Sequence, residues 1–116
     1  MTDPKIYKLI LSLHKKTENG EVRWVKSIDQ EYLASFSDYS VGVSQQANRT
    51  TGYVDVYLTI YDDQGEEIET AVDTEFAEDP ATVDAAEMLI DLYKSARRMA
   101  LGVDTALDKL LLELGV

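Results

Sequence analysis

The sequence predicts a two-layer α+β fold, in which a four-stranded antiparallel meander sheet carries one N-terminal and two C-terminal helices on one face. Three observations predict it. Residues 53–61 alternate apolar and polar side chains, as a strand with one buried face does. Short polar turns separate the predicted strands, which favours antiparallel pairing. Apolar residues at helical spacing mark both ends of the chain. At 116 residues, we expect a single α+β domain over residues 1–116.

The first helix is expected over residues 4–16. Asp3 can cap its first turn, and Pro4 suits the first helical position, where a missing N–H costs nothing. Asn19 and Gly20 can end the helix in the left-handed conformation. Its apolar face follows i, i+3, i+4, i+7 spacing and consists of Ile6, Leu9, Ile10 and Leu13.

Four strands are expected, over residues 21–27, 31–45, 53–61 and 66–72. The second is ambiguous, because Ser37 and Asp38 interrupt it and either one long strand or a hairpin of two fits the pattern. A two-residue hairpin turn usually contains glycine, which this pair lacks, so we expect one bent strand with a bulge. The last two strands flank a turn at residues 62–65, in which Gly65 supplies a positive φ, and should form an antiparallel hairpin.

The C-terminal part is expected to be helical. An acidic linker over residues 73–80 precedes a long helix over residues 81–101, which Gly102 ends. Asp104 can then cap a short last helix. This helix carries leucines at i, i+3, i+4, i+7 spacing, which predicts a buried face; contact with a second copy or with a partner is the alternative. These leucines are Leu107, Leu110, Leu111 and Leu114.

The net charge of −11 comes from one part of the chain. Residues 51–92 contain thirteen acidic residues and no basic one, whereas the segments on either side are nearly neutral. Such a surface should repel nucleic acid and anionic membranes and attract basic proteins. The chain has no cysteine, and we see neither a signal peptide nor a membrane-spanning segment, so we expect a cytoplasmic protein.

No residue pattern indicates catalysis, a cofactor or a metal. His14 is the single histidine, and we expect it to face solvent near a helix end. The acids around residues 62–67 lack the spacing of a calcium loop, and the glycines form no nucleotide-binding loop. We therefore assign no catalytic, cofactor-binding or metal-binding residue.

The strand at residues 53–61 presents tyrosines every fourth residue, on the face opposite its valines. Tyrosine is enriched in protein interfaces, although it also favours strands generally. Acidic residues surround these tyrosines along the hairpin. We predict a partner-binding surface made of Tyr53, Asp55, Tyr57, Tyr61, Asp62, Asp63, Glu66, Glu67 and Glu69.

Several segments together resemble small bacterial α+β domains that have no assigned function. They are residues 57–69 (YLTIYDDQGEEIE), residues 92–112, Trp24 and the strand at residues 39–43. The resemblance spans most of the chain. It implies a bacterial cytoplasmic origin and an arrangement of helix, sheet and C-terminal helices, and it transfers no site residue.

These observations favour a non-enzymatic interaction or regulatory module that binds a basic protein partner. A sharper version is a DNA-mimicking inhibitor, in which the hairpin acids imitate phosphates. One alternative is a small-ligand-binding domain or small enzyme with a pocket between sheet and helices, using His14, Tyr57 or the acids near Asp73. Another is an accessory domain that works beside a larger protein or as a homo-oligomer, such as a homodimer.

Overall fold

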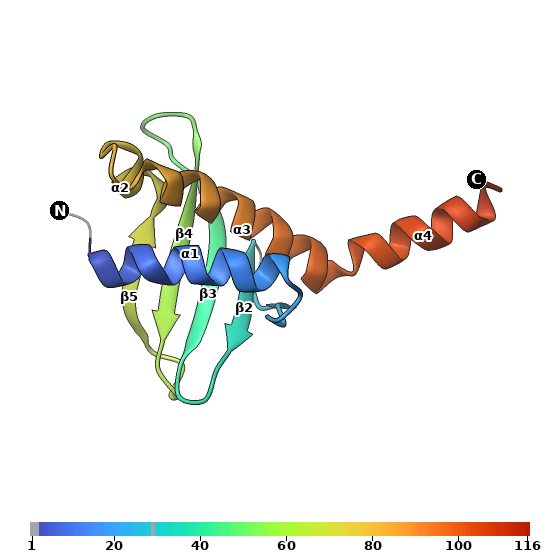
Figure 1. Cartoon of the computed structure of the whole chain (residues 1–116), viewed down its shortest axis with the longest axis horizontal. Helices are drawn as coiled ribbons and strands as arrows, with labels where there is room; N and C mark the ends of the chain where they lie inside the picture. Colours follow the sequence, from blue (N-terminus) through green and yellow to red (C-terminus); the bar gives the residue numbers. More distant parts are fainter. Residues whose placement is uncertain (1–2, 29) are drawn as a thin grey trace.

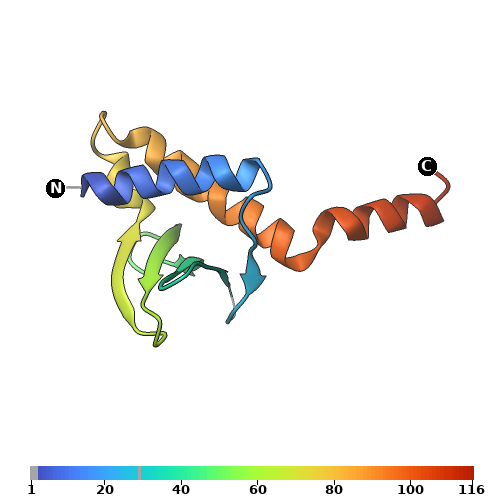
Figure 2. The ribbon, with the colours of Figure 1, turned by 60° about the horizontal axis from the view of Figure 1, so that its bottom comes forward.

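The computed structural model describes residues 3–28 and 30–116, which form a sheet covered on one side by helices (Figures 1 and 2). The sheet is antiparallel, and its strands follow the order of the chain. They are β1 (Val25–Lys26), β2 (Glu31–Ser35), β3 (Ser40–Ala47), β4 (Val54–Tyr61) and β5 (Glu67–Val72). The helices are α1 (Pro4–Glu18), α2 (Asp73–Ala77), α3 (Val83–Leu101) and α4 (Val103–Glu113). The prediction of an α+β fold with an antiparallel meander is confirmed.

The described chain has five strands rather than four, because the segment predicted as one bent strand is a hairpin of β2 and β3. Ser35 pairs with Ser40, and the Phe36 N–H donates to the Tyr39 carbonyl at 2.8 Å. Neither Ser37 nor Asp38 has a positive φ. This turn therefore closes without the glycine that the sequence argument required, and the preference for a single strand was wrong.

The core lies between the sheet and the two long helices. Val43 and Leu58 reach it from the sheet, Leu89 and Leu92 from α3, and Ile10 from α1, all almost fully buried. As predicted, Asp3 caps α1, where its carboxylate accepts the Lys5 N–H at 2.8 Å. The hairpin of β4 and β5 is also confirmed.

Helix α2 lies within the predicted acidic linker. Phe76 is 1% exposed and attaches this short helix to the core. At its first residue, the Asp73 carboxylate accepts the Val56 N–H at 3.0 Å. Strand β5 has ended at Val72, so Asp73 replaces the acceptor that a longer strand would have supplied.

Helix α4 projects from the body and contributes no buried residue (Figure 1). The prediction that its leucines are buried, and that both C-terminal helices cover the sheet, was wrong for this helix. Gly102, with φ of 65°, turns the chain away at the end of α3. Asp104 pairs with Arg98 across this bend rather than capping α4. In the described part of the chain, no helix has both the length and the apolar character needed to cross a membrane.

Candidate functional site on the open sheet face

The sheet face opposite the helices contains a hollow of about 370 Å³. Because side chains alternate along a strand, burying Val43, Val56 and Leu58 on the helix side directs their neighbours to this face. The lining comes from all four long strands and the loop before β2. It consists of Ile28, Glu31, Ser44, Gln45, Gln46, Tyr57, Thr59, Tyr61, Glu67 and Thr70.

A carboxylate with little solvent access lies in this hollow. Glu31 is only 6% exposed although no helix covers it. The Tyr61 hydroxyl donates to Glu31 Oε2 at 2.6 Å. Gly42, on the strand between them, leaves the space that both side chains use, since a Cβ there would lie 2.7 Å from Glu31 Oε2 and 3.1 Å from the Tyr61 ring. The sheet therefore holds Glu31 and Tyr61 as a fixed pair across Gly42.

This arrangement disfavours the phenolate form of Tyr61. Partial burial, the hydrogen bond to Glu31 and the negative charges of Glu31 and Glu67 raise the pKa of Tyr61 from 10.0 to about 12. Tyr61 therefore remains a neutral hydrogen-bond donor throughout the physiological range. The hollow is lined by carboxylates, hydroxyls and aromatic rings, and none of the described lining residues is basic.

We expect Tyr61 to deprotonate at a higher pH than ordinary tyrosines do. Its folded-state pKa lies above the value of 10.0, so its contribution to stability is complete below pH 10 and is lost as the pH rises through about 12. A difference titration of phenolate absorbance, wild type minus Tyr61→Phe, should show a midpoint close to pH 12.

Gly42→Ala provides the companion variant. Its methyl group would displace the Glu31 carboxylate from Tyr61, so the phenolate should then form at lower pH. A wild-type difference titration centred at the ordinary tyrosine value, or one that Gly42→Ala leaves unchanged, would show that the Glu31–Tyr61 pair does not control this ionisation.

The structure brings three of the nine predicted partner-binding residues together in the hollow: Tyr57, Tyr61 and Glu67. Tyr53 precedes β4 and is 75% exposed, so it does not belong to the row of side chains that β4 places on the open face. Asp55 is on the strand but is buried, and its carboxylate accepts the Asn48 side-chain N–H at 3.0 Å. The Asp55 carboxylate therefore binds a group of the protein itself and is not presented to a partner.

The other predicted acids lie along the β4–β5 hairpin outside the hollow. The Asp62 carboxylate accepts the N–H groups of Gln64 and Glu66, both at 2.9 Å, and so shapes the turn. The remaining three are exposed and give the hairpin its negative surface: Asp63, Glu66 and Glu69.

Sequence reasoning missed Glu31, Ser44, Thr59 and Thr70 as parts of the site. Glu31 pairs directly with Ser44 across β2 and β3. Treating residues 31–45 as one strand placed these two residues far apart, so their proximity was hidden. Gly42 is the signal that was available, because an interior strand glycine often marks a close approach of other groups.

The residues named for the alternative enzyme are not gathered in this hollow. His14 lies on α1, with Nε2 3.7 Å from Glu18 Oε1 and 4.0 Å from Asp91 Oδ2. The Asp73 carboxylate already accepts a hydrogen bond from the Val56 N–H. Within residues 3–28 and 30–116, no three histidine or acidic side chains are grouped as a metal site requires.

Comparisons of the chain with family models, curated proteins and solved structures found no match.

Proposed function

We propose that the chain is a non-enzymatic protein-interaction module that binds a basic protein partner, and that the hollow on the open sheet face receives a cationic side chain of that partner. The observation that carries the proposal is the lining itself. Glu31 and Glu67 supply negative charge, Tyr57 and Tyr61 supply aromatic rings, and no described lining residue is basic. Cations are attracted both to carboxylates and to the faces of aromatic rings.

The surrounding charge favours the same partner. The acidic hairpin borders the hollow, and residues 51–92 contain no basic side chain. Such a field increases the rate at which a basic partner arrives, and it weakens as salt screens it. The hollow then adds a specific contact to this general attraction.

A fluorescent lysine-rich peptide tests the proposal, with a glutamine-for-lysine peptide as control. The lysine peptide should bind at low ionic strength, and Glu67→Gln should weaken binding by about tenfold, the loss expected for one hydrogen bond to a charged group. Asp63→Asn removes the same charge outside the hollow and should change the affinity by less than about twofold.

Equal losses in Glu67→Gln and Asp63→Asn would mean that attraction is diffuse and that the hollow is not the site. Binding that ignores ionic strength would contradict the electrostatic basis of the proposal.

A further inference from the structure

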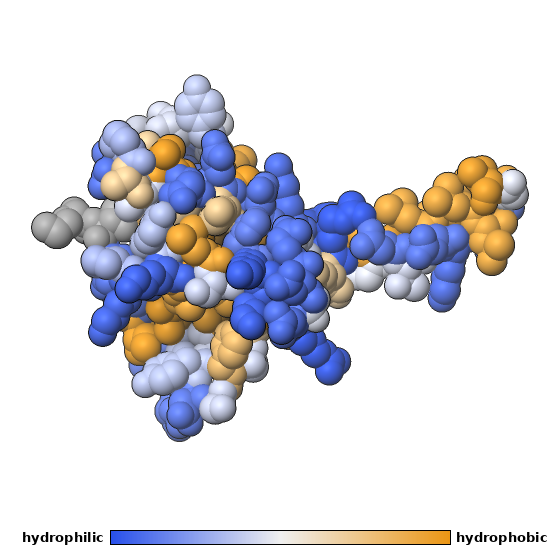
Figure 3. Space-filling view, viewed as in Figure 1, coloured by the Kyte–Doolittle hydropathy of each residue, from blue (hydrophilic) through white to orange (hydrophobic). Residues whose placement is uncertain are grey.

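Helix α4 exposes its leucines to solvent (Figure 3). The four stripe leucines, Leu107, Leu110, Leu111 and Leu114, are 44%, 54%, 46% and 74% exposed. We call them the α4 stripe. An isolated helix of 11 residues is only marginally stable in water, and a continuous exposed apolar row is typical of an interaction site. The α4 stripe therefore needs a covering surface that its own body does not supply.

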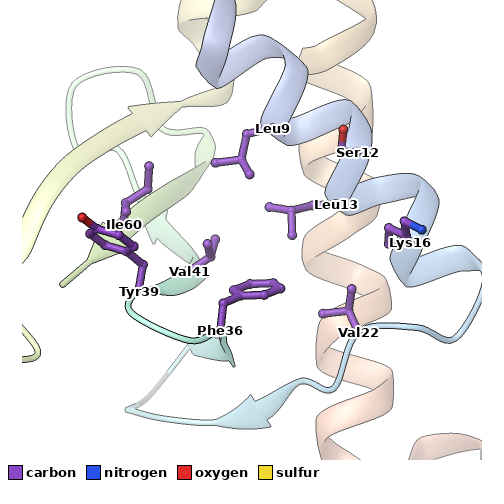
Figure 4. A pocket seen from close by; sticks show the side chains of 9 residues that line it. All are labelled: Leu9, Ser12, Leu13, Lys16, Val22, Phe36, Tyr39, Val41 and Ile60. Carbon is purple, nitrogen blue, oxygen red and sulfur yellow. The ribbon is translucent and has the colours of Figure 1, made fainter. Parts of the chain in front are cut away.

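The body contains an apolar groove, separate from the polar hollow on the other face. It lies between α1 and the β2–β3 turn and has a volume of about 360 Å³ (Figure 4). Phe36 and Tyr39 stand at its edge and are 50% and 53% exposed. Its lining consists of Leu9, Leu13, Val22, Phe36, Tyr39, Val41 and Ile60, with Ser12 and Lys16 along α1.

We propose that the α4 stripe of a second copy of this chain occupies the groove, each copy giving its α4 to the other. The two surfaces match in spacing. Helix α1 lines the groove with residues 9, 12, 13 and 16, and the stripe has the same i, i+3, i+4, i+7 pattern. Both extend over two helical turns, about 10 Å, so the length of the α4 stripe matches the length of α1 that lines the groove.

Charge favours this contact over pairing of α4 with α4. Helix α1 carries four lysines and one carboxylate, whereas α4 carries three carboxylates and one lysine. Lys16 is already near Glu21, and Asp104 pairs with Arg98. Lys5, Lys8 and Lys15 then leave α1 with a positive charge that attracts the remaining carboxylates of α4, Asp108 and Glu113, whereas two copies of α4 are both negative.

A second copy is favoured over the helix's own groove by the direction of α4. The helix leaves the end of α3 and extends away from the body (Figures 1 and 2). Reciprocal exchange closes a twofold dimer and covers both stripes and both grooves at once.

Sedimentation of the full chain at micromolar concentration measures the oligomeric state and so tests whether the α4 stripe joins two copies. The wild type should be a dimer, and Leu110→Asp with Leu111→Asp should make it monomeric. Leu112→Asp is the matched control, because Leu112 is 79% exposed and lies off the stripe, so this variant should stay dimeric. A monomeric wild type, or loss of the dimer in Leu112→Asp, would overturn the proposal.

A groove variant separates exchange from α4–α4 pairing. Phe36→Asp should also be monomeric, with the buried Trp24 reporting by fluorescence that the fold is kept. Mixing it with the Leu110→Asp, Leu111→Asp variant should restore association, because the intact α4 of one copy meets the intact groove of the other. A Phe36→Asp dimer, or a mixture that stays monomeric, would contradict reciprocal exchange.

The proposal stands apart from the basic-partner proposal, and salt distinguishes the two. An apolar contact between two chains of net charge −11 should persist in roughly 1 M salt, where the Debye length is about 3 Å. Peptide binding at the hollow should be lost there. Glu67→Gln should weaken binding of the lysine-rich peptide and leave the dimer unchanged.

Discussion

Replacing Phe76 by alanine should lower the free energy of unfolding by about 3–5 kcal/mol, the range measured for large-to-small changes in protein cores. Phe76 is 1% exposed and is the buried apolar residue of α2. Its loss leaves a cavity between α2 and the core, and domains of this size are stable by only about 5–15 kcal/mol in total. Urea denaturation monitored by circular dichroism measures the change.

Phe36→Ala is the matched control, since the chain has only two phenylalanines and Phe36 is 50% exposed. With both phenylalanine variants made in the Leu110→Asp, Leu111→Asp background, where the proposed dimer contact of Phe36 is absent, Phe36→Ala should cost less than about 1 kcal/mol, because surface substitutions have small effects. Similar losses for the two variants would show that α2 is not anchored through Phe76.

Removing the Asp73 side chain should cost about 1.5–3 kcal/mol, the range for hydrogen bonds to charged groups. In Asp73→Ala, the Val56 N–H loses its acceptor at 3.0 Å in a place that water scarcely reaches. The same urea denaturation gives the free energy, and hydrogen exchange of the Val56 amide should become faster.

Asp73→Asn keeps an oxygen acceptor of the same shape and should recover more than half of that loss, because a neutral hydrogen bond still forms. If alanine and asparagine destabilise the protein equally, the charge of Asp73 rather than its hydrogen bond to Val56 stabilises this corner.

The sequence predicted the elements whose signals are local. The alternation over residues 53–61, the turn containing Gly65 and the cap at Asp3 each depend on neighbours in the chain, and each is found. Placing the tyrosines opposite the valines followed from the same alternation, and Tyr57 and Tyr61 indeed lie on the open face.

The remaining features depend on contacts between residues that are distant in the sequence, or on the direction in which a helix leaves the body. The spacing of the α4 leucines is that of any buried helix face, and nothing local indicates that Gly102 directs them away from the body. The Glu31–Tyr61 bond joins residues thirty positions apart, and it requires the pairing of β2 with β3 that the sequence left open. Phe76 was hidden because acidic residues surround it.

The left-handed turn at Gly102 has a consequence for how this chain tolerates change. It divides the described chain into a body that holds the buried core and a helix, α4, that contributes no buried residue. Substitutions along α4 remove no group that is buried within one copy, so the folding of an isolated copy should tolerate them. In the proposed dimer the same substitutions should still lower the melting temperature, because association adds to the stability of the folded state, so the tolerance of α4 to change depends on the protein concentration.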